Sequence, residues 1–150
     1  MGKSDRGDVS ADAVEKVSLA NAKIRKIRSG NDSLPALIAT GSMVKTAVEI
    51  ADAHGALEVW SVPSIKPLGT EDFQSFSANR RTLVTIEEHS VMGGLGSAVA
   101  EIYSSYGQGK VLRIGVEDRF SHACGSYLLQ EHGLDYESIK QKVKKIVEPQ

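Results

Sequence analysis

Short apolar runs alternate along this chain with segments whose apolar residues recur at helical spacing. The apolar runs have the length and composition of strands buried on both faces, and they cover residues 35–40, 57–62, 82–86 and 111–116. Helical spacing follows in residues 43–53, from Ser97 onward, in residues 127–132 and in residues 135–147. The alternation predicts an α/β fold with a parallel or mostly parallel sheet and helices on both faces.

Local signals mark where the predicted helices begin and end. Ser42 has the chemistry of an N-cap for the helix over residues 43–53, and Gly55 follows that helix as a C-terminal glycine would. Thr70 or Asp72 can begin a short helix that buries Phe73. The lysines of the last helix gather toward its C-terminus, as the helix dipole favours.

The N-terminal part differs in composition from the rest. Residues 1–11 offer almost nothing to bury and predict a mobile tail. Residues 23–28 place Ile24 and Ile27 among cations, which allows a phosphate-binding patch, but we favour an amphipathic connector with a solvated basic face. The predicted organisation is a tail and connector over residues 1–29 and one domain over residues 30–150.

Composition limits the classes of function. The 150 residues fit one domain, and the net charge of -1 gives no general attraction to nucleic acid or to an anionic membrane. No apolar run has the length of a membrane span, and the first thirty residues show no secretory signal. Cys124 is the single cysteine, so no internal disulfide can form. We expect a cytoplasmic protein without nucleic-acid or membrane partners.

Polar residues follow three of the predicted strands, where ligands collect in a parallel sheet. They are Gly41-Ser42, Glu87-Glu88-His89 and Glu117-Asp118. On a strand, Glu87 and His89 point to the same side, which is compatible with an acid/base pair or two metal ligands. No other histidine stands at a spacing that would complete a metal site. We favour a structural carboxylate that holds a histidine or an arginine from a neighbouring domain.

Glycines follow this polar triplet, at Gly93, Gly94 and Gly96, before the next helix. A phosphate-binding loop is one interpretation, but the third glycine of the dinucleotide fingerprint and the Lys-Ser/Thr ending of a P-loop are both missing. We favour a structural turn that lets the helix approach the sheet, and an anion on the helix N-terminus stays open. Cys124 and His122 lie two apart with no third group, which does not indicate a nucleophilic site.

Four separated motifs resemble the C-terminal domain of transketolase. They occur in the order of that family, over residues 36–49, 61–68, 84–101 and 113–120, and Gly133-Leu134 fits the same pattern. The resemblance implies a Rossmann-like three-layer sandwich with about five strands, mostly parallel, and one antiparallel edge strand. Gly69 stands where relatives usually have aspartate, which removes one helix cap.

The resemblance also implies a function. Transketolases use thiamine diphosphate and a divalent metal, magnesium, to move a two-carbon ketol unit between sugar phosphates, and both groups bind in domains that precede the C-terminal one. No catalytic, cofactor-binding or metal residue carries over to this chain. We expect a structural part of such an enzyme, either a subunit of a split enzyme or an excised fragment, that joins thiamine-binding domains in a homo- or hetero-oligomer.

Two alternatives stay open. Deoxyxylulose phosphate synthase and the β subunit of 2-oxo acid dehydrogenases share the glycine-rich turn, although the Glu-Glu-His spelling and Gly133-Leu134 favour transketolase. A non-catalytic module that senses an anionic metabolite is the rival from another class. In either case the predicted interface or anion site consists of Glu87, Glu88, His89, Gly93, Gly94, Gly96 and Ser97.

Overall fold

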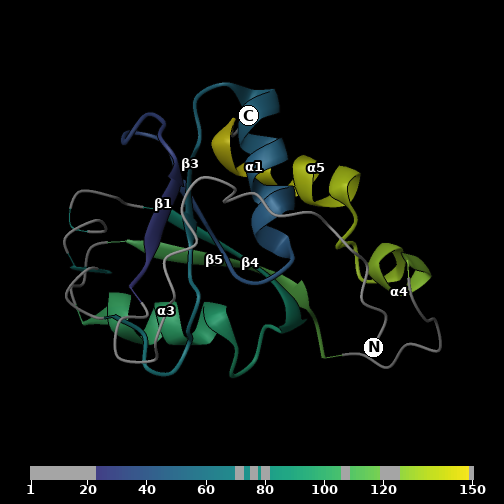
Figure 1. Cartoon of the computed structure of the whole chain (residues 1–150). Helices are drawn as coiled ribbons and strands as arrows, with labels where there is room; N and C mark the ends of the chain where they lie inside the picture. Colours follow the sequence, from purple (N-terminus) through teal and green to yellow (C-terminus); the bar gives the residue numbers. More distant parts are fainter. Residues whose placement is uncertain are drawn as a thin grey trace.

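A computed structural model describes residues 23–69, 73–74, 78, 82–105, 109–118 and 126–148. Strands and helices alternate through most of this range, as the hydrophobic pattern predicts (Figure 1). The elements are β1 (Arg25–Arg28), β2 (Ala36–Ala39), α1 (Met43–His54), β3 (Glu58–Ser61), β4 (Thr82–Ser90), α3 (Leu95–Ser104), β5 (Lys110–Val116), α4 (Ser126–Glu131) and α5 (Tyr136–Val147).

The five strands form one sheet in the order β1-β3-β2-β4-β5. The pairs β2–β3, β2–β4 and β4–β5 are parallel, and β1 pairs antiparallel with β3 at one edge. This confirms the predicted fold class. The chain moves from β2 to β3 on one side and then crosses to β4 on the other, so the carboxyl ends of β2 and β4 flank the switch point of the sheet.

Two apolar cores, one on each face of the sheet, hold the three layers together. Leu37 and Ile86 belong to the core under α1 and α5, whereas Ile38 and Leu83 belong to the core under α3. Adjacent residues of a strand point to opposite faces of the sheet, and helices cover both faces here. All four residues of β2 are therefore buried, and its sequence is a continuous apolar run. Figure 1 shows α1 and α5 on one side of the sheet and α3 on the other.

Strand β1 is the element that the sequence pattern did not reveal. The expected connector over residues 23–28 contains this strand, whose Arg25 lies opposite Ser61 of β3. The following turn packs tightly on the start of β3, because a Cβ on Gly30 would lie 2.4 Å from the carbonyl carbon of Leu57. The segment therefore belongs to the sheet, while the predicted domain boundary at residues 29 and 30 stays a prediction.

The helix-end signals were correct at one end of α1 and wrong at the other. Gly55 ends the helix in the left-handed conformation with φ 84°, as predicted. Ser42 stands at the N-cap position, but its backbone is helical and its side chain makes no capping hydrogen bond. Asp135 caps α5 by accepting from the backbone N–H of Ser138. Thr70 and Asp72 lie outside the described residues. Among the described helices, none has the length and apolar character that crossing a membrane requires.

Candidate functional site at the carboxyl end of strand β4

Strand β4 carries the polar triplet that the sequence singles out. Contrary to the prediction of an end after Ile86, the strand continues to Ser90. Ser90 lies opposite Val116 of β5, and the backbone N–H of Val91 donates to the carbonyl of Val116 at 3.0 Å. Glu87 therefore stays within the strand, on the face that α3 covers.

Glu87 binds the N-terminus of helix α3. Its Oε2 accepts from the backbone N–H of Leu95 at 2.7 Å, and its Oε1 accepts from that of Gly96 at 2.8 Å. The side chain is fully buried. Hydrogen bonds to an ionised acceptor are stronger than neutral ones, and a negative charge at a helix N-terminus is stabilised by the helix dipole. The described residues supply no ion-pair partner for Glu87, so these N–H groups replace water around the carboxylate.

The glycines that follow make this contact possible. A Cβ on Gly94 would lie 2.0 Å from Oε2 of Glu87 and 2.7 Å from the carbonyl oxygen of Ser90. A Cβ on Gly96 would lie 2.8 Å from Oγ1 of Thr85. Side chains at these two positions would push α3 off the sheet. The glycine run is thus a close-approach turn, the interpretation that we favoured from the sequence.

The loop between β4 and α3 is tied at Ser97. The hydroxyl of Ser97 donates to the carbonyl of Val91 and accepts from the backbone N–H of Gly93, both at 3.0 Å. The guanidinium of Arg113 on β5 donates to the same carbonyl at 3.1 Å and to the Ser97 hydroxyl at 3.3 Å. Ser97 and Gly93 therefore fix the loop shape, and Arg113 adds a contact that the sequence pattern did not indicate.

Glu87 and His89 are not brought together. The oxygens of Glu87 face the backbone of α3, whereas His89 is exposed at the end of β4. Glu88 is half-buried, and Met92 in the following loop is 67% exposed. The carboxyl end of β4 thus separates into a buried part, centred on Glu87, and an exposed rim of His89 and Met92.

The other candidate positions show no second constellation in the described part of the chain. The hydroxyl of Ser42 is buried and has no hydrogen-bond partner among the described residues. Glu117 and Asp118 are exposed. No three His, Cys, Asp or Glu side chains among the described residues stand close enough to hold a metal ion. His122 and Cys124 lie outside the described residues.

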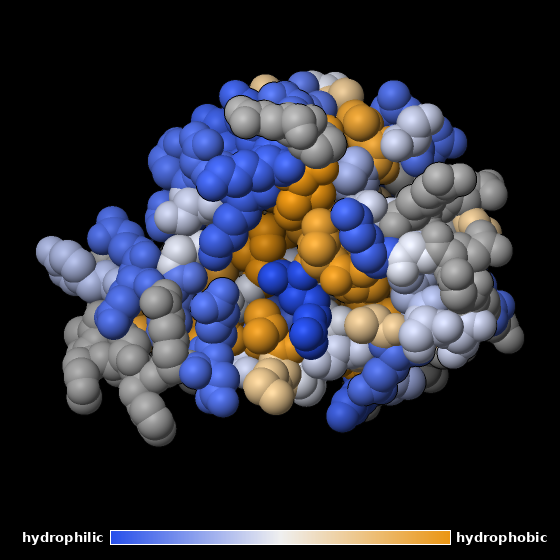
Figure 2. All heavy atoms as spheres, turned by 180° about the vertical axis from the view of Figure 1, so that it is seen from behind, coloured by the Kyte–Doolittle hydropathy of each residue, from blue (hydrophilic) through white to orange (hydrophobic). Residues whose placement is uncertain are grey.

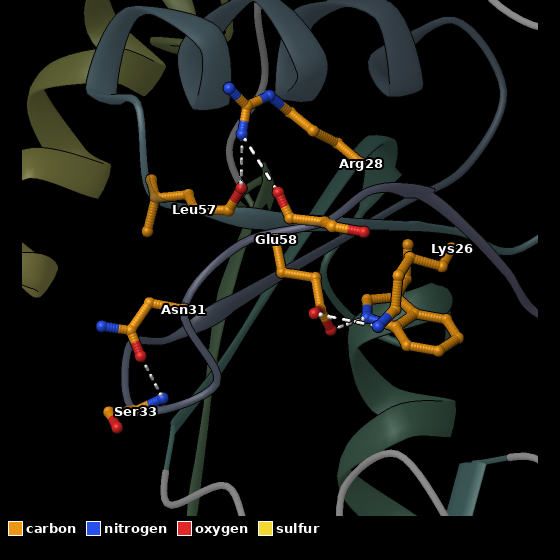
Figure 3. A network of polar contacts seen from close by, with 8 residues as sticks. Lys26, Arg28, Asn31, Ser33, Leu57 and Glu58 are labelled. Atoms are coloured by element: carbon orange, nitrogen blue, oxygen red, sulfur yellow. Dashed lines mark hydrogen bonds and ion pairs between the residues drawn. The ribbon is translucent and has the colours of Figure 1, made fainter.

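A second buried carboxylate, Glu58 on β3, escaped the sequence analysis. It is 2% exposed, its Oε2 lies 3.2 Å from Nζ of Lys26, and its Oε1 accepts from the indole N–H of Trp60. The Lys26 ammonium also lies 5.1 Å from the centre of the Trp60 ring, a cation–π geometry. Figure 3 shows Glu58 reaching from β3 toward Lys26 of β1. The sequence did contain one signal for this site: Glu58 is the single charged residue in the run over residues 57–62. A charged side chain that is buried in such a strand requires a partner.

Arg28 joins the same edge strand to the opposite layer. Its guanidinium donates to Asp52 of α1. It also donates to the carbonyl of Leu57 at 3.3 Å, a contact that Figure 3 shows. Lys26 and Arg28 therefore clamp β1 onto β3 and α1. The basic segment that resembled a solvated face uses two of its cations inside the domain.

Comparisons with known proteins agree with this architecture. The family model described as "Transketolase, C-terminal domain" matches residues 22–139. The chain is 41% identical over 126 residues to 1-deoxy-D-xylulose-5-phosphate synthase of Chlorobium luteolum, covering 80% of this chain and 20% of that protein. It is 39% identical over 113 residues to a putative transketolase C-terminal section of Methanocaldococcus jannaschii, covering 71% and 35%.

Solved structures give the same result. A split gene transketolase, described as an inactive beta4 tetramer, is similar with a TM-score of 0.73 and 32% identity, over 84% of this chain and 42% of that one. Transketolase from Leishmania mexicana has the same fold, with a TM-score of 0.62 and 17% identity over 86% of this chain and 19% of its own. The chain thus spans from about a fifth to less than half the length of these relatives.

Proposed function

The chain belongs to the family of transketolase C-terminal domains, and from this premise we propose that it is a non-catalytic part of a transketolase-like enzyme. It supports the transfer of a two-carbon ketol unit between sugar phosphates once it is joined to thiamine-diphosphate-binding domains or subunits. Its own task is to complete and stabilise that assembly.

The use of Glu87 is the observation that carries this proposal. A catalytic carboxylate needs an oxygen within reach of substrate, either directly or through one water. Both oxygens of Glu87 bind backbone N–H groups of α3, and the side chain is fully buried. The most polar position of the switch point therefore supports packing of α3 on the sheet.

The described residues do not fit the cofactor or its metal. A magnesium ion takes oxygen ligands, and Glu58 and Glu87, the carboxylates that are buried among the described residues, already have partners for both oxygens. No acidic or histidine cluster stands elsewhere in the described part of the chain. We place thiamine diphosphate and magnesium in the partner domains, and no step of the chemistry is assigned to this chain.

The relatives support a partner and an oligomer. This chain covers 20% of the Chlorobium luteolum synthase and 42% of the split gene transketolase chain, so each relative has further sequence beyond this domain. The split gene transketolase that this chain is similar to is an inactive beta4 tetramer. We propose that this chain functions in a homo- or hetero-oligomer, with the exposed rim at His89 and Met92 against a neighbouring domain.

The product distinguishes two kinds of protein that are similar to this chain. A transketolase moves a two-carbon ketol unit between sugar phosphates, whereas the synthase is named for making 1-deoxy-D-xylulose 5-phosphate. The similar proteins include both kinds. We propose ketol transfer between sugar phosphates as the first activity to test, and formation of 1-deoxy-D-xylulose 5-phosphate as the alternative.

Reconstitution tests the proposal. The chain, a thiamine-binding partner and their mixture are assayed for each of the two activities, in the presence of thiamine diphosphate and magnesium. We expect turnover by the mixture that exceeds turnover by the partner and none by the chain alone. Turnover by the isolated chain would refute the proposal.

The rim gives a sharper version of the same experiment. His89→Ala is expected to weaken association with the partner and to leave the melting temperature of the chain unchanged, because the side chain is exposed. An unchanged affinity would count against the rim as the contact. Tyr127→Ala, at a position 71% exposed on α4, is the matched control and is expected to leave affinity unchanged.

The alternative function, sensing of an anionic metabolite at residues 93–97, predicts that such a ligand raises the melting temperature of the chain, whereas the structural role predicts no shift. A ligand that binds the folded state raises the melting temperature by mass action. Because the N–H groups of Leu95 and Gly96 already bind Glu87, we expect no shift with sugar phosphates or nucleotides. A shift that Ser97→Ala abolishes would favour the sensing function.

A further inference from the structure

Strand β5 forms the edge of the sheet opposite β1. It pairs with β4 on one side, and no strand among the described residues pairs with the other side. An edge of this kind presents a row of backbone N–H and C=O groups that can pair with another strand. The strand has seven residues, from Lys110 to Val116, which is enough for a full ladder.

The surface at the middle of this edge is apolar around Arg113. Val111, Leu112 and Val116 are only partly buried, and Arg113 is exposed. Figure 2, which views the molecule from behind, shows a band of apolar atoms in the middle of that face. Polar atoms border the band on the same face. An apolar band with a polar border is typical of an interface.

The charges of the strand select its partner. Lys110 is the first residue of β5, and Asp118 lies two residues beyond its last residue, Val116; both are exposed. An antiparallel copy of the same strand would bring the Lys110 of each chain opposite the Asp118 of the other. Opposite charges at directly opposed positions stabilise a sheet, and like charges destabilise it. The segment is therefore complementary to itself in the antiparallel direction.

The side chains between these ends fit one register. Centring the two-fold axis on Ile114 places Leu112 opposite Val116 of the second copy, so apolar residues continue on the face under α1 and α5. Arg113 then lies opposite Gly115 of the second copy, where no side chain competes for space. Centring on Arg113 would oppose two guanidinium groups, which disfavours that register.

We propose that two copies of this chain pair antiparallel along β5, centred on Ile114, to form one continuous sheet across the dimer. The contact is isologous, since each copy uses the same surface. This goes beyond the proposed function, because the pairing needs no thiamine-binding partner and is measured on the chain alone.

Charge reversal tests the pairing and its register together. Sedimentation equilibrium of the chain over a wide concentration range gives the dimer dissociation constant. We expect Lys110→Glu and Asp118→Lys each to weaken the dimer about tenfold, since two ion pairs become two repulsions. The double variant restores opposite charges and should return to within about threefold of the original constant.

A second variant tests the apolar part of the edge. Leu112→Lys places a charge in the middle of the contact and should leave the chain monomeric, because lysine on an edge strand blocks pairing. Tyr127→Lys, on exposed α4, is the matched control and should remain dimeric. A chain that is monomeric at every concentration, a dimer that Leu112→Lys does not disrupt, or a double reversal as weak as the single ones would each overturn the pairing. Ketol transfer by the reconstituted mixture is measured separately. The pairing along β5 and the proposed function can therefore fail independently, and the two failures can be told apart.

Discussion

Two buried glutamates on the same face of the sheet are held in different ways. Glu87 on β4 is surrounded by backbone N–H groups at a helix N-terminus, and no ion pair reaches it within the described residues. Glu58 on β3 meets the ammonium of Lys26 and the indole of Trp60. Both side chains are nearly inaccessible, at 0% and 2% exposure. One carboxylate thus depends on fixed dipoles and the other on side chains.

The difference determines how much stability the fold loses when each carboxylate is removed. The groups around Glu87 belong to a helix and cannot move away, so losing the carboxylate leaves them buried without an acceptor. Lys26 is 42% exposed and can return to water if Glu58 is removed. Glu87 should therefore be the more costly residue to lose, although no cation among the described residues pairs with it.

Glu87→Ala should have the largest effect of the substitutions considered. Two buried N–H groups at the start of α3 lose their acceptor, which costs about 4 kcal/mol of unfolding free energy in total. Urea denaturation monitored by circular dichroism measures the change. Glu87→Gln keeps the shape and should lose about half as much, because an amide oxygen can accept only one of the two bonds well. Equal stability of Glu87→Ala and the unaltered chain would contradict the capping role.

Gly94→Ala should cost about 3 kcal/mol, because its methyl group overlaps the Glu87 carboxylate and the Ser90 carbonyl. Gly93→Ala is the control: its Cβ meets nothing within 4 Å, so only its positive φ of 76° is strained, at about 1 kcal/mol. In a Glu87→Ala background the cost of Gly94→Ala should fall. Simple additivity of the two changes would show that the carboxylate is not the obstacle.

Glu58→Ala should cost about 2 kcal/mol, less than Glu87→Ala, since the remaining ammonium is accessible to water. Lys26→Met is the reverse test, because it leaves the buried carboxylate with the Trp60 indole but without its cation. The double variant should be less destabilised than the sum of the two single variants by about 1 kcal/mol. If Glu58→Ala proves more destabilising than Glu87→Ala, the ranking of the two sites is wrong.

Asp135→Ala should have a small effect, about 1 kcal/mol, because this carboxylate caps α5 at a partly exposed position. The side-chain hydrogen bond from Ser138, at 2.5 Å, is the main cause that holds the pKa of Asp135 below its ordinary value. A lowered pKa stabilises the fold above the ordinary value of about 4 and loses this contribution as the pH falls through the folded-state pKa. The stability difference between Asp135→Ala and the unaltered chain should shrink over that acid range and stay constant above it.

The sequence predicted most of the sheet because buried parallel strands leave a strong local signal. Apolar runs identified four of the five strands, and the glycine at position 55 identified the end of α1. Strand β1 was missed because its four residues include three cations, two of which act inside the domain through Glu58 and Asp52. Such pairing depends on residues far apart in the chain, which local periodicity does not contain.

The candidate site was located correctly in the chain but not in detail. The polar triplet and the glycines do stand together where β4 meets α3. Strand alternation places Glu87 and His89 on one side, yet Glu87 turns to the helix that follows and His89 remains exposed. The direction of a side chain depends on where the chain returns after a turn, and that is set by packing of α3 on the sheet.

The most direct test of the central claim is the turnover of the reconstituted enzyme with the Glu87→Gln chain, measured at saturating chain concentration. If Glu87 builds the domain, stability falls while the maximal turnover of the assembled complex stays within about twofold of the unaltered enzyme. General acid–base residues contribute about a hundredfold or more. A loss of that size in a complex that is still fully assembled would contradict a purely structural role for this site.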